Sequence, residues 1–218
     1  TIDSIIISSI IGQTALGIFA LSNYISSLIQ IPQRSIVSIS VPFLSQAWRE
    51  KNYDLVSRIY KRSSINLLLL SLFIFGNIWL NFEDAIHVLK MDLAFLTGKS
   101  IALFIALKII VDMGTGVNGQ IIGTSNFWRF EFFTGLILLV IAAPLNYILI
   151  KKMGIVGAGI SNLVSYTIYN FIRILFLWKK FKMQPFSWNT ILSVVLWAAT
   201  YCIIFYTTKN LHGWTGII

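Results

Sequence analysis

Long apolar stretches, separated by short polar connections, repeat along the whole sequence. A helix that crosses a membrane needs about 20 mostly apolar residues, because the hydrocarbon core is about 30 Å thick and each residue rises about 1.5 Å. The pattern therefore predicts an all-α fold, a polytopic transmembrane helical bundle. One partial and six full spans are expected, at residues 1–12, 15–47, 63–82, 100–123, 128–150, 155–178 and 191–206.

The span at 15–47 is too long for one straight crossing. Its 33 residues would form a helix of about 50 Å, which exceeds the bilayer thickness unless the helix tilts or overhangs. Pro32 and Pro42 lie inside it, and each removes a backbone donor and favours a kink. We therefore expect a bent span that reaches past the membrane surface.

The composition supports the membrane assignment. Hydrophobic residues make up 56% of the chain and charged residues only 11%, with a mean hydropathy of +0.79. A soluble domain carries about 25% charged residues. Buried helices of a large soluble protein would need polar outer helices to cover them, and none is predicted.

The net charge of +9 is explained by where the basic residues lie. Basic residues favour the cytoplasmic side of a membrane, so the richer set of alternating connections is expected there. The spread over separate connections gives no reason to expect a nucleic-acid partner. The richer set holds Arg49, Lys51, Arg58, Lys61, Arg62, Arg129, Lys179, Lys180 and Lys182; the opposite set holds Lys90, Lys99, Lys151, Lys152 and Lys209.

The inventory of reactive side chains is small. One cysteine and two distant histidines cannot form a metal site or a Cys/His nucleophile, so no metal, no catalytic residue and no enzymatic activity are predicted. The connection 81–99 carries Glu83, Asp84 and Asp92, which we interpret as a solvated loop rather than an acid/base pair. A short amphipathic helix is expected there, around Ile86, Val88 and Leu89.

Residues 114–119 match the G-x-G-x-x-G spacing of a dinucleotide-binding loop. That motif needs a strand before it and an acidic residue about 20 positions later, and this sequence has neither. On one continuous helix at about 100° per residue, a single face carries Lys108, Asp112, Thr115, Gly116, Gly119 and Gly123, whereas Gly114 and Asn118 point elsewhere. The glycines of this face are expected to form a groove for helix packing.

Ionisable groups within spans usually face the bundle interior or a water-filled cavity. Lys108 and Asp112 are four residues apart and are expected to pair, as a structural lock or as part of a substrate or ion path. Arg34 lies deep in its span, and Asp3 lies near mid-membrane as a candidate proton or cation site. Arg173 is expected to extend toward the cytoplasmic surface.

Three stretches carry a resemblance to a known family. They are ALGIFALSNYISSLIQIPQRSIVSISVPFLSQAW at 15–48, VDMGTGVNGQIIGTSNFWRFE at 111–131, and PLNYILIKKMGIVGAGISNLVSY at 144–166. Their order and spacing resemble the C-terminal half of Wzx-like polysaccharide-biosynthesis flippases, in the superfamily that also holds the multidrug and toxic-compound (MATE-like) exporters. The resemblance places a helix-packing hairpin at Gly157 and Gly159, and it matches Asp3 to an acidic position of the family's seventh span.

The resemblance implies a fold of two six-helix bundles around a central cavity. Residues 1–178 would belong to the C-terminal bundle and 179–218 to additional C-terminal helices. Because the sequence begins and ends inside apolar stretches, we expect it to be a piece of a longer chain. Helix hinges are expected at Pro32 and Pro42.

The function implied is translocation of a lipid-linked oligosaccharide, a polyprenyl-diphosphate glycan, across the bacterial inner membrane. No cofactor is expected, although coupling to H⁺ or Na⁺ is. The expected partners are the bilayer, the glycan substrate and other membrane proteins of polysaccharide assembly. Two alternatives stay open: a cation-coupled multidrug exporter of the same superfamily, and a polytopic membrane enzyme of polysaccharide assembly.

Overall fold

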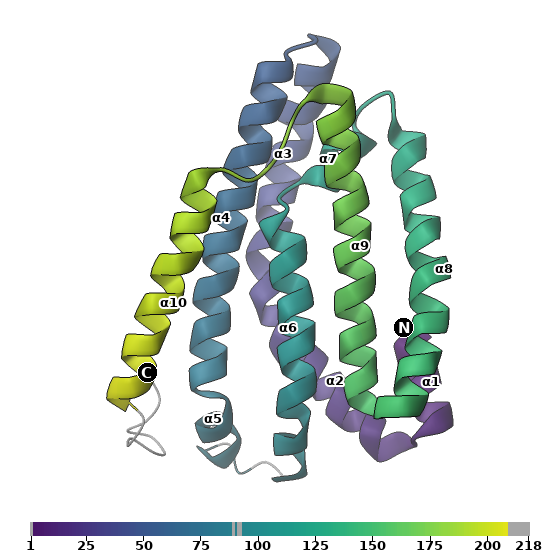
Figure 1. Ribbon diagram of the computed structural model, residues 1–218, viewed down its shortest axis with the longest axis vertical. Coiled ribbons are helices and arrows are strands. Elements are labelled where there is room, and N and C mark those ends of the chain that lie inside the picture. Colours follow the sequence, from purple (N-terminus) through teal and green to yellow (C-terminus); the bar gives the residue numbers. More distant parts are fainter. Residues whose placement is uncertain (1, 89, 91–92, 209–218) are drawn as a thin grey trace.

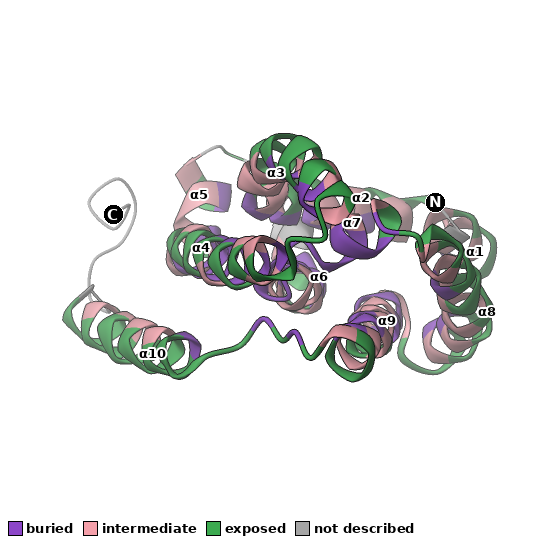
Figure 2. Cartoon of the chain, turned by 90° about the horizontal axis from the view of Figure 1, so that it is seen from above, coloured by how far each residue is buried: buried purple, intermediate pink, exposed green. Residues whose placement is uncertain are grey.

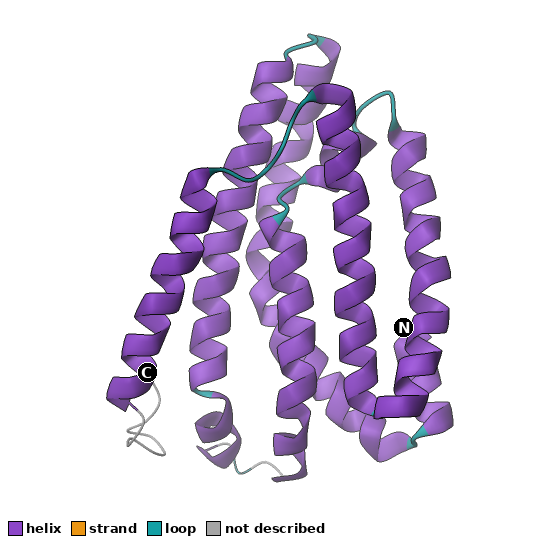
Figure 3. Ribbon diagram, viewed as in Figure 1, coloured by secondary structure: helices purple, strands orange, loops and turns teal. Residues whose placement is uncertain are grey.

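The computed structural model describes residues 2–88, 90 and 93–208, and in this part of the chain the regular elements are all helices (Figures 1 and 3). The prediction of an all-α bundle is therefore confirmed. The elements are α1 (Ile2–Ile10), α2 (Gln13–Ser27), the 3-10 turn η1 (Leu28–Gln30), α3 (Ile31–Arg49), α4 (Tyr53–Leu80), α5 (Phe82–Val88), the 3-10 turn η2 (Leu93–Gly98), α6 (Lys99–Gly114), α7 (Asn118–Gly123), α8 (Trp128–Met153), α9 (Ile155–Phe181) and α10 (Trp188–Thr208).

Five of these segments are long and apolar enough to cross a membrane: α2 to α3 taken together, α4, α8, α9 and α10. Helix α4 starts at Tyr53, ten residues before the span predicted at 63–82. The side chain of Asn52 caps it by accepting a hydrogen bond from the Leu55 N–H at 3.0 Å. The basic residues at 58–62 therefore lie on a helix rather than in a connection. The amphipathic helix expected near Ile86 is α5; Leu89 lies outside the described residues.

Helix α6 lies at the centre of the bundle and packs against α2, α4 and α9. Its apolar side chains Ile101, Ile105, Ile109 and Met113 are buried, because neighbours cover it on several sides. Helix α8 pairs with α9 and α1, whereas α10 lies at the edge of the bundle against α4 (Figure 2). The interior of the bundle is thus built around a helix of only 16 residues.

The helix connections gather at two ends of the molecule (Figure 1). One end, here called the basic end, holds the α3–α4 connection, the α7–α8 turn and the end of α9 (residues 49–53, 123–128 and 179–187). The opposite end holds the α1–α2 turn, the connection from α4 to α6 and the α8–α9 turn. This is the alternation expected from the charge pattern; Lys209 lies outside the described residues.

The predicted bend in the 15–47 span falls at its first proline. Turn η1 separates α2 from α3, and Pro32 lies in the first turn of α3, where a missing N–H costs no helical hydrogen bond. Figure 1 shows α2 and α3 running in different directions. Pro42 lies inside α3, which continues through it.

The prediction of one continuous helix over 100–123 is wrong. Helix α6 ends at Gly114, and α7 starts only at Asn118. Gly116 has a φ of 69°, a left-handed conformation that side chains rarely adopt. A Cβ on it would lie 2.8 Å from Ser63 Oγ and 2.9 Å from the backbone N of Ser64.

The expected glycine groove is therefore also wrong. Because α6 and α7 are separate helices, residues before and after the break do not lie on one helical face. Gly114 and Asn118, which were expected to point elsewhere, are buried. Gly119 packs against Arg173, whereas Gly123 is exposed and has open space around its Cβ position. The glycines of this segment therefore do not share one packing face: Gly116 faces α4, Gly119 faces Arg173, and Gly123 faces open space.

Two serines of α4 satisfy the backbone groups that the break frees. The Ser64 hydroxyl donates to the Gly114 carbonyl at 2.6 Å, and the Ser63 hydroxyl accepts from the Val117 N–H at 3.3 Å. Non-helical backbone at membrane depth is tolerated only where protein or water supplies such partners. The α4 serines thus allow the helix to be interrupted inside the bundle.

At the α8–α9 hairpin, Gly154 takes a φ of 63° and so permits the sharp turn. A Cβ on Gly157 would lie 2.2 Å from the carbonyl oxygen of Leu149, and one on Gly159 would lie 2.9 Å from Phe104 Cβ. Helix α9 therefore approaches α8 closely at Gly157 and α6 closely at Gly159, and glycine is needed at both positions.

We expect Gly116→Ala to destabilise the protein by at least about 1–2 kcal/mol, because alanine is strained in the left-handed region and would collide with α4. The matched variant Gly123→Ala should be neutral or stabilising by up to about 1 kcal/mol, since its Cβ meets open space. Thermal unfolding of the purified protein in detergent measures both. Equal effects of the two substitutions would contradict the structural role of Gly116.

Candidate functional site

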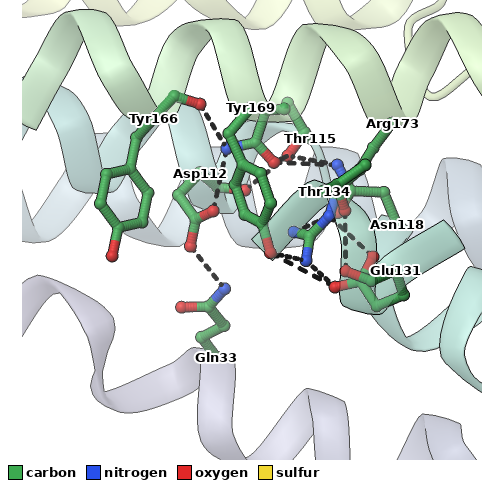
Figure 4. Close-up of polar contacts among 10 residues, drawn as sticks. Gln33, Asp112, Thr115, Asn118, Glu131, Thr134, Tyr166, Tyr169 and Arg173 are labelled. Carbon is green, nitrogen blue, oxygen red and sulfur yellow. Dashed lines mark hydrogen bonds and ion pairs between the residues drawn. The ribbon is translucent and has the colours of Figure 1, made fainter. Parts of the chain in front are cut away.

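Buried and half-buried polar side chains form a connected network among α3, the α6–α7 break, α8 and α9 (Figure 4). We call this set the central network. It lies within the spanning part of the bundle, where unsatisfied polar groups are costly. Its members are Gln33, Asp112, Thr115, Asn118, Glu131, Tyr169, Asn170 and Arg173.

Asn170 of α9 is the centre of the network. Its Nδ2 donates to Asp112 Oδ1 at 3.0 Å, and its Oδ1 accepts from Thr115 Oγ1 at 3.0 Å and from Asn118 Nδ2 at 2.9 Å. Asp112 lies on α6, Thr115 lies in the break, and Asn118 begins α7. One side chain of α9 thus ties both sides of the break together.

Asp112 does not form the expected pair with Lys108. The second oxygen of its carboxylate accepts from Gln33 Nε2 at 3.2 Å, which links α6 to α3 (Figure 4). The Lys108 ammonium instead lies 3.7 Å from the ring centroid of Tyr166 on α9. No ion pair joins Lys108 and Asp112, both of which the structure describes. A cation–π contact holds Lys108, whereas side-chain amides donate hydrogen bonds to both oxygens of the Asp112 carboxylate.

Arg173 was expected to extend to the surface, but it is buried at 8% exposure. Its guanidinium forms an ion pair with Glu131 of α8, with Nε donating to Oε2 at 2.9 Å, and it also donates to the Tyr169 hydroxyl. A buried charge requires such a partner. Gly119 leaves the room for it, because a Cβ there would lie 2.9 Å from an Arg173 nitrogen.

A second polar group surrounds Asp3 at the start of α1. The Asp3 carboxylate accepts hydrogen bonds from the side-chain amides of Asn146 on α8 and Asn162 on α9, the latter at 3.1 Å. A cavity of about 320 Å³ opens beside these three residues and Tyr166. The remaining lining is apolar and comes from α8.

One oxygen at this cavity lacks a partner. The buried Oδ1 of Asn146 accepts no hydrogen bond from the described residues. A carboxylate beside amide oxygens is the ligand type that hard cations prefer. Because an amide can be rotated to exchange its oxygen and nitrogen, Asn146 and Asn162 can both turn oxygens toward a cation at Asp3. No group of three or more His, Cys, Asp or Glu side chains suited to a metal ion occurs in the described part of the chain.

Arg34 lies outside both polar groups. It is exposed and makes no hydrogen bond to the described residues, so it is not buried in this bundle, contrary to the expectation. The reason is helical phase: α3 turns Ser40, Leu44 and Ala47 inward. The exposed positions recur every three or four residues and mix polar with apolar side chains, the apolar ones including Leu28, Ile31, Ile39 and Phe43. The polar members, named here the polar stripe, are Tyr24, Ser27, Arg34, Ser35, Ser38 and Gln46.

Other exposed helix faces are apolar. Helices α8 and α10 are long, apolar and largely uncovered, as expected for surfaces that contact lipid. The bundle therefore has two kinds of exposed face within its spanning segments. The exposed apolar positions include Phe132, Leu136, Leu139 and Val140 on α8 and Ile191, Val195 and Leu196 on α10.

Several residues of the polar groups were not identified from the sequence. Glu131 and Asn146 come from α8, and four others come from α9. A signal for the α9 residues was present, because polar positions that recur every three or four residues share one helix face. The face carries Asn162, Tyr166, Tyr169, Asn170 and Arg173.

No model of a known protein family, no curated protein and no solved structure matches this chain. Fold and site together define an all-helical protein with helices long and apolar enough to span a membrane, polar groups in its interior, and an exposed α2–α3 face that carries an arginine among polar and apolar side chains.

Proposed function

We propose that this chain is part of a flippase that moves a lipid-linked oligosaccharide across the bacterial inner membrane by alternating access. The polar stripe is the observation that carries the proposal. Apolar side chains such as Ile39 and Phe43 lie between its members, but an unpaired arginine is costly against lipid, so this face belongs against water or protein. The apolar faces of α8 and α10 suit lipid.

The polar stripe suits an amphipathic substrate that carries sugar and diphosphate. Its hydroxyl and amide groups offer hydrogen bonds to a glycan, and the unpaired Arg34 guanidinium offers paired donors to a diphosphate. The lipid tail of such a substrate would remain in the bilayer. The resemblance of the sequence to Wzx-like flippases supports this substrate class.

Movement between states would centre on the junction of α2 and α3. Turn η1 and Pro32 interrupt the helix there, and Gln33 connects it to Asp112. Hinges in transport proteins are a few terminal or connecting residues that absorb backbone changes. Helix α3 can thus reorient while the network around Asn170 holds α6, α7 and α9.

Asp3 is the better of the two candidate sites for a coupling cation. Amides donate to both oxygens of each carboxylate, but the Asp3 carboxylate also borders a cavity and the unpartnered amide oxygen of Asn146. Sodium and proton remain the two ions expected from the sequence, and the amide oxygens favour sodium.

A cation-coupled exporter of small lipophilic molecules is a second candidate. The cavity beside Asp3 favours it, because most of its lining comes from apolar residues such as Leu138, Leu139 and Ala142. Expression of the full-length protein in a drug-sensitive host separates the two functions: the exporter confers drug resistance, and the flippase restores glycan display in a strain that lacks it.

We expect Arg34→Gln to lower glycan export at least about tenfold at normal expression, because hydrogen bonds to charged groups contribute about 1.5–3 kcal/mol. Surface glycan in a complemented export-deficient strain measures this. Arg58→Gln is the matched control, since Arg58 is an exposed arginine of α4 and is not part of the stripe. Unchanged export in both Arg34→Ala and Lys108→Ala would contradict a cationic substrate path.

We expect Na⁺ to raise the melting temperature of the purified protein relative to choline at equal ionic strength, because a bound ligand stabilises the folded state. Asp3→Asn should lose this response, since it removes the charge, whereas Asp112→Asn should keep it. A response that survives in Asp3→Asn and disappears in Asp112→Asn would assign the cation to the central network instead.

A further inference from the structure

A cavity of about 330 Å³ lies at the basic end, between the α3–α4 connection, the α7–α8 turn and the end of α9. Cationic and amide groups of Arg49, Lys51 and Asn126 line it, together with several aromatic rings. Its volume is at the lower limit of ligand pockets, which hold about 300–1,000 Å³. The cavity is separate from the polar groups around Asn170 and Asp3.

The aromatic wall of this cavity is tightly packed. The Trp48 ring centroid lies 5.0 Å from that of Phe181 and 5.8 Å from that of Tyr53, and Phe127 lies 5.8 Å from Phe181. Trp48 Nε1 also donates to the Ile121 carbonyl at 3.0 Å, which fixes the indole. Aromatic rings with one polar atom are typical of the headgroup level of a membrane.

The polar lining is rich in donors that are free to bind a ligand. Arg49, Lys51 and Asn126 make no side-chain hydrogen bond to the described residues. The neighbouring acid, Glu50, instead accepts from Gln46 Nε2 at 2.7 Å. The cavity therefore presents two uncompensated positive charges and an amide, which is the donor set that an anion requires.

The backbone at Lys51 brings this residue into the cavity lining. Its φ of 54° is left-handed, in the position after a helix where glycine is usual. A non-glycine residue is strained there, and Lys90 and Lys182 adopt the same conformation. Glycine can therefore replace Lys51 at no cost in backbone conformation, so the contribution of its side chain can be tested separately.

We propose that this cavity binds a phosphate group, from the headgroup of an anionic phospholipid or from a soluble phosphate ester. A fork of guanidinium nitrogens and an ammonium match phosphate oxygens. The position at the basic end suits the leaflet that is rich in anionic lipid. The inference does not depend on what the protein transports.

The test uses the purified chain in detergent, titrated with short-chain phosphatidylglycerol, phosphatidylcholine of equal chain length, and glycerol 3-phosphate. Native mass spectrometry measures each affinity. Wild type should prefer a phosphate-bearing anion over phosphatidylcholine. Arg49→Gln and Lys51→Gly should each lower that affinity at least about fivefold. Lys51→Gly should also keep or raise the melting temperature, because glycine relaxes the left-handed backbone.

Lys182→Gly is the matched control. Lys182 has a φ of 57° at the end of α9 and lies at the basic end of the molecule, but it does not line the cavity. The substitution removes the same charge as Lys51→Gly. The affinity of Lys182→Gly for the phosphate-bearing anion should therefore equal that of wild type. Binding of phosphatidylglycerol alone identifies the lipid as the source, and equal binding of glycerol 3-phosphate identifies a soluble ester. Wild-type affinity in Lys51→Gly, an equal loss in Lys182→Gly, or no preference for either phosphate anion overturns the proposal.

Discussion

The structure depends on how the break between α6 and α7 is accommodated inside the bundle. A helix interrupted at membrane depth exposes backbone groups that lipid cannot satisfy. Ser63 and Ser64 of α4 supply partners to the backbone, and Asn170 of α9 joins the side chains on both sides of the break. These bonds hold α4, α6, α7 and α9 together, and the glycine at 116 is what allows α4 to approach so closely.

Most charged side chains of the spanning region are held by partners near these joined helices. Glu131 neutralises Arg173, an aromatic ring holds Lys108, and amides hold Asp112 and Asp3. Arg34 differs from these charges because it has no partner among the described residues and faces outward. An unpartnered guanidinium with hydroxyl and amide groups along the same exposed face, in a bundle whose α8 and α10 faces are apolar, is the feature that favours a water-filled path along α2 and α3.

The sequence predicted the fold class well, because hydrophobic length is a strong signal for spanning helices. Proline chemistry likewise located the bend before α3. The break at Thr115–Val117 was not predicted. The apolar pattern is compatible with one continuous helix, and it does not show that Gly116 adopts a positive φ. The sequence placed Lys108 and Asp112 four residues apart. It did not show that Gln33, Tyr166 and Asn170, which lie far away in the chain, contact these two side chains and decide where they point.

The polar stripe is the central claim, and water accessibility tests it most directly. In a Cys202→Ser background, which removes the exposed native thiol, single cysteines at Ser38 and at Val140 are treated in native membranes with a membrane-impermeant maleimide. Thiols react with it as hydrated thiolates. A wet face on α3 predicts labelling at position 38 and none at position 140, with full labelling of both after denaturation. Protection of position 38 to the same degree as position 140 would contradict a water-filled path along this face.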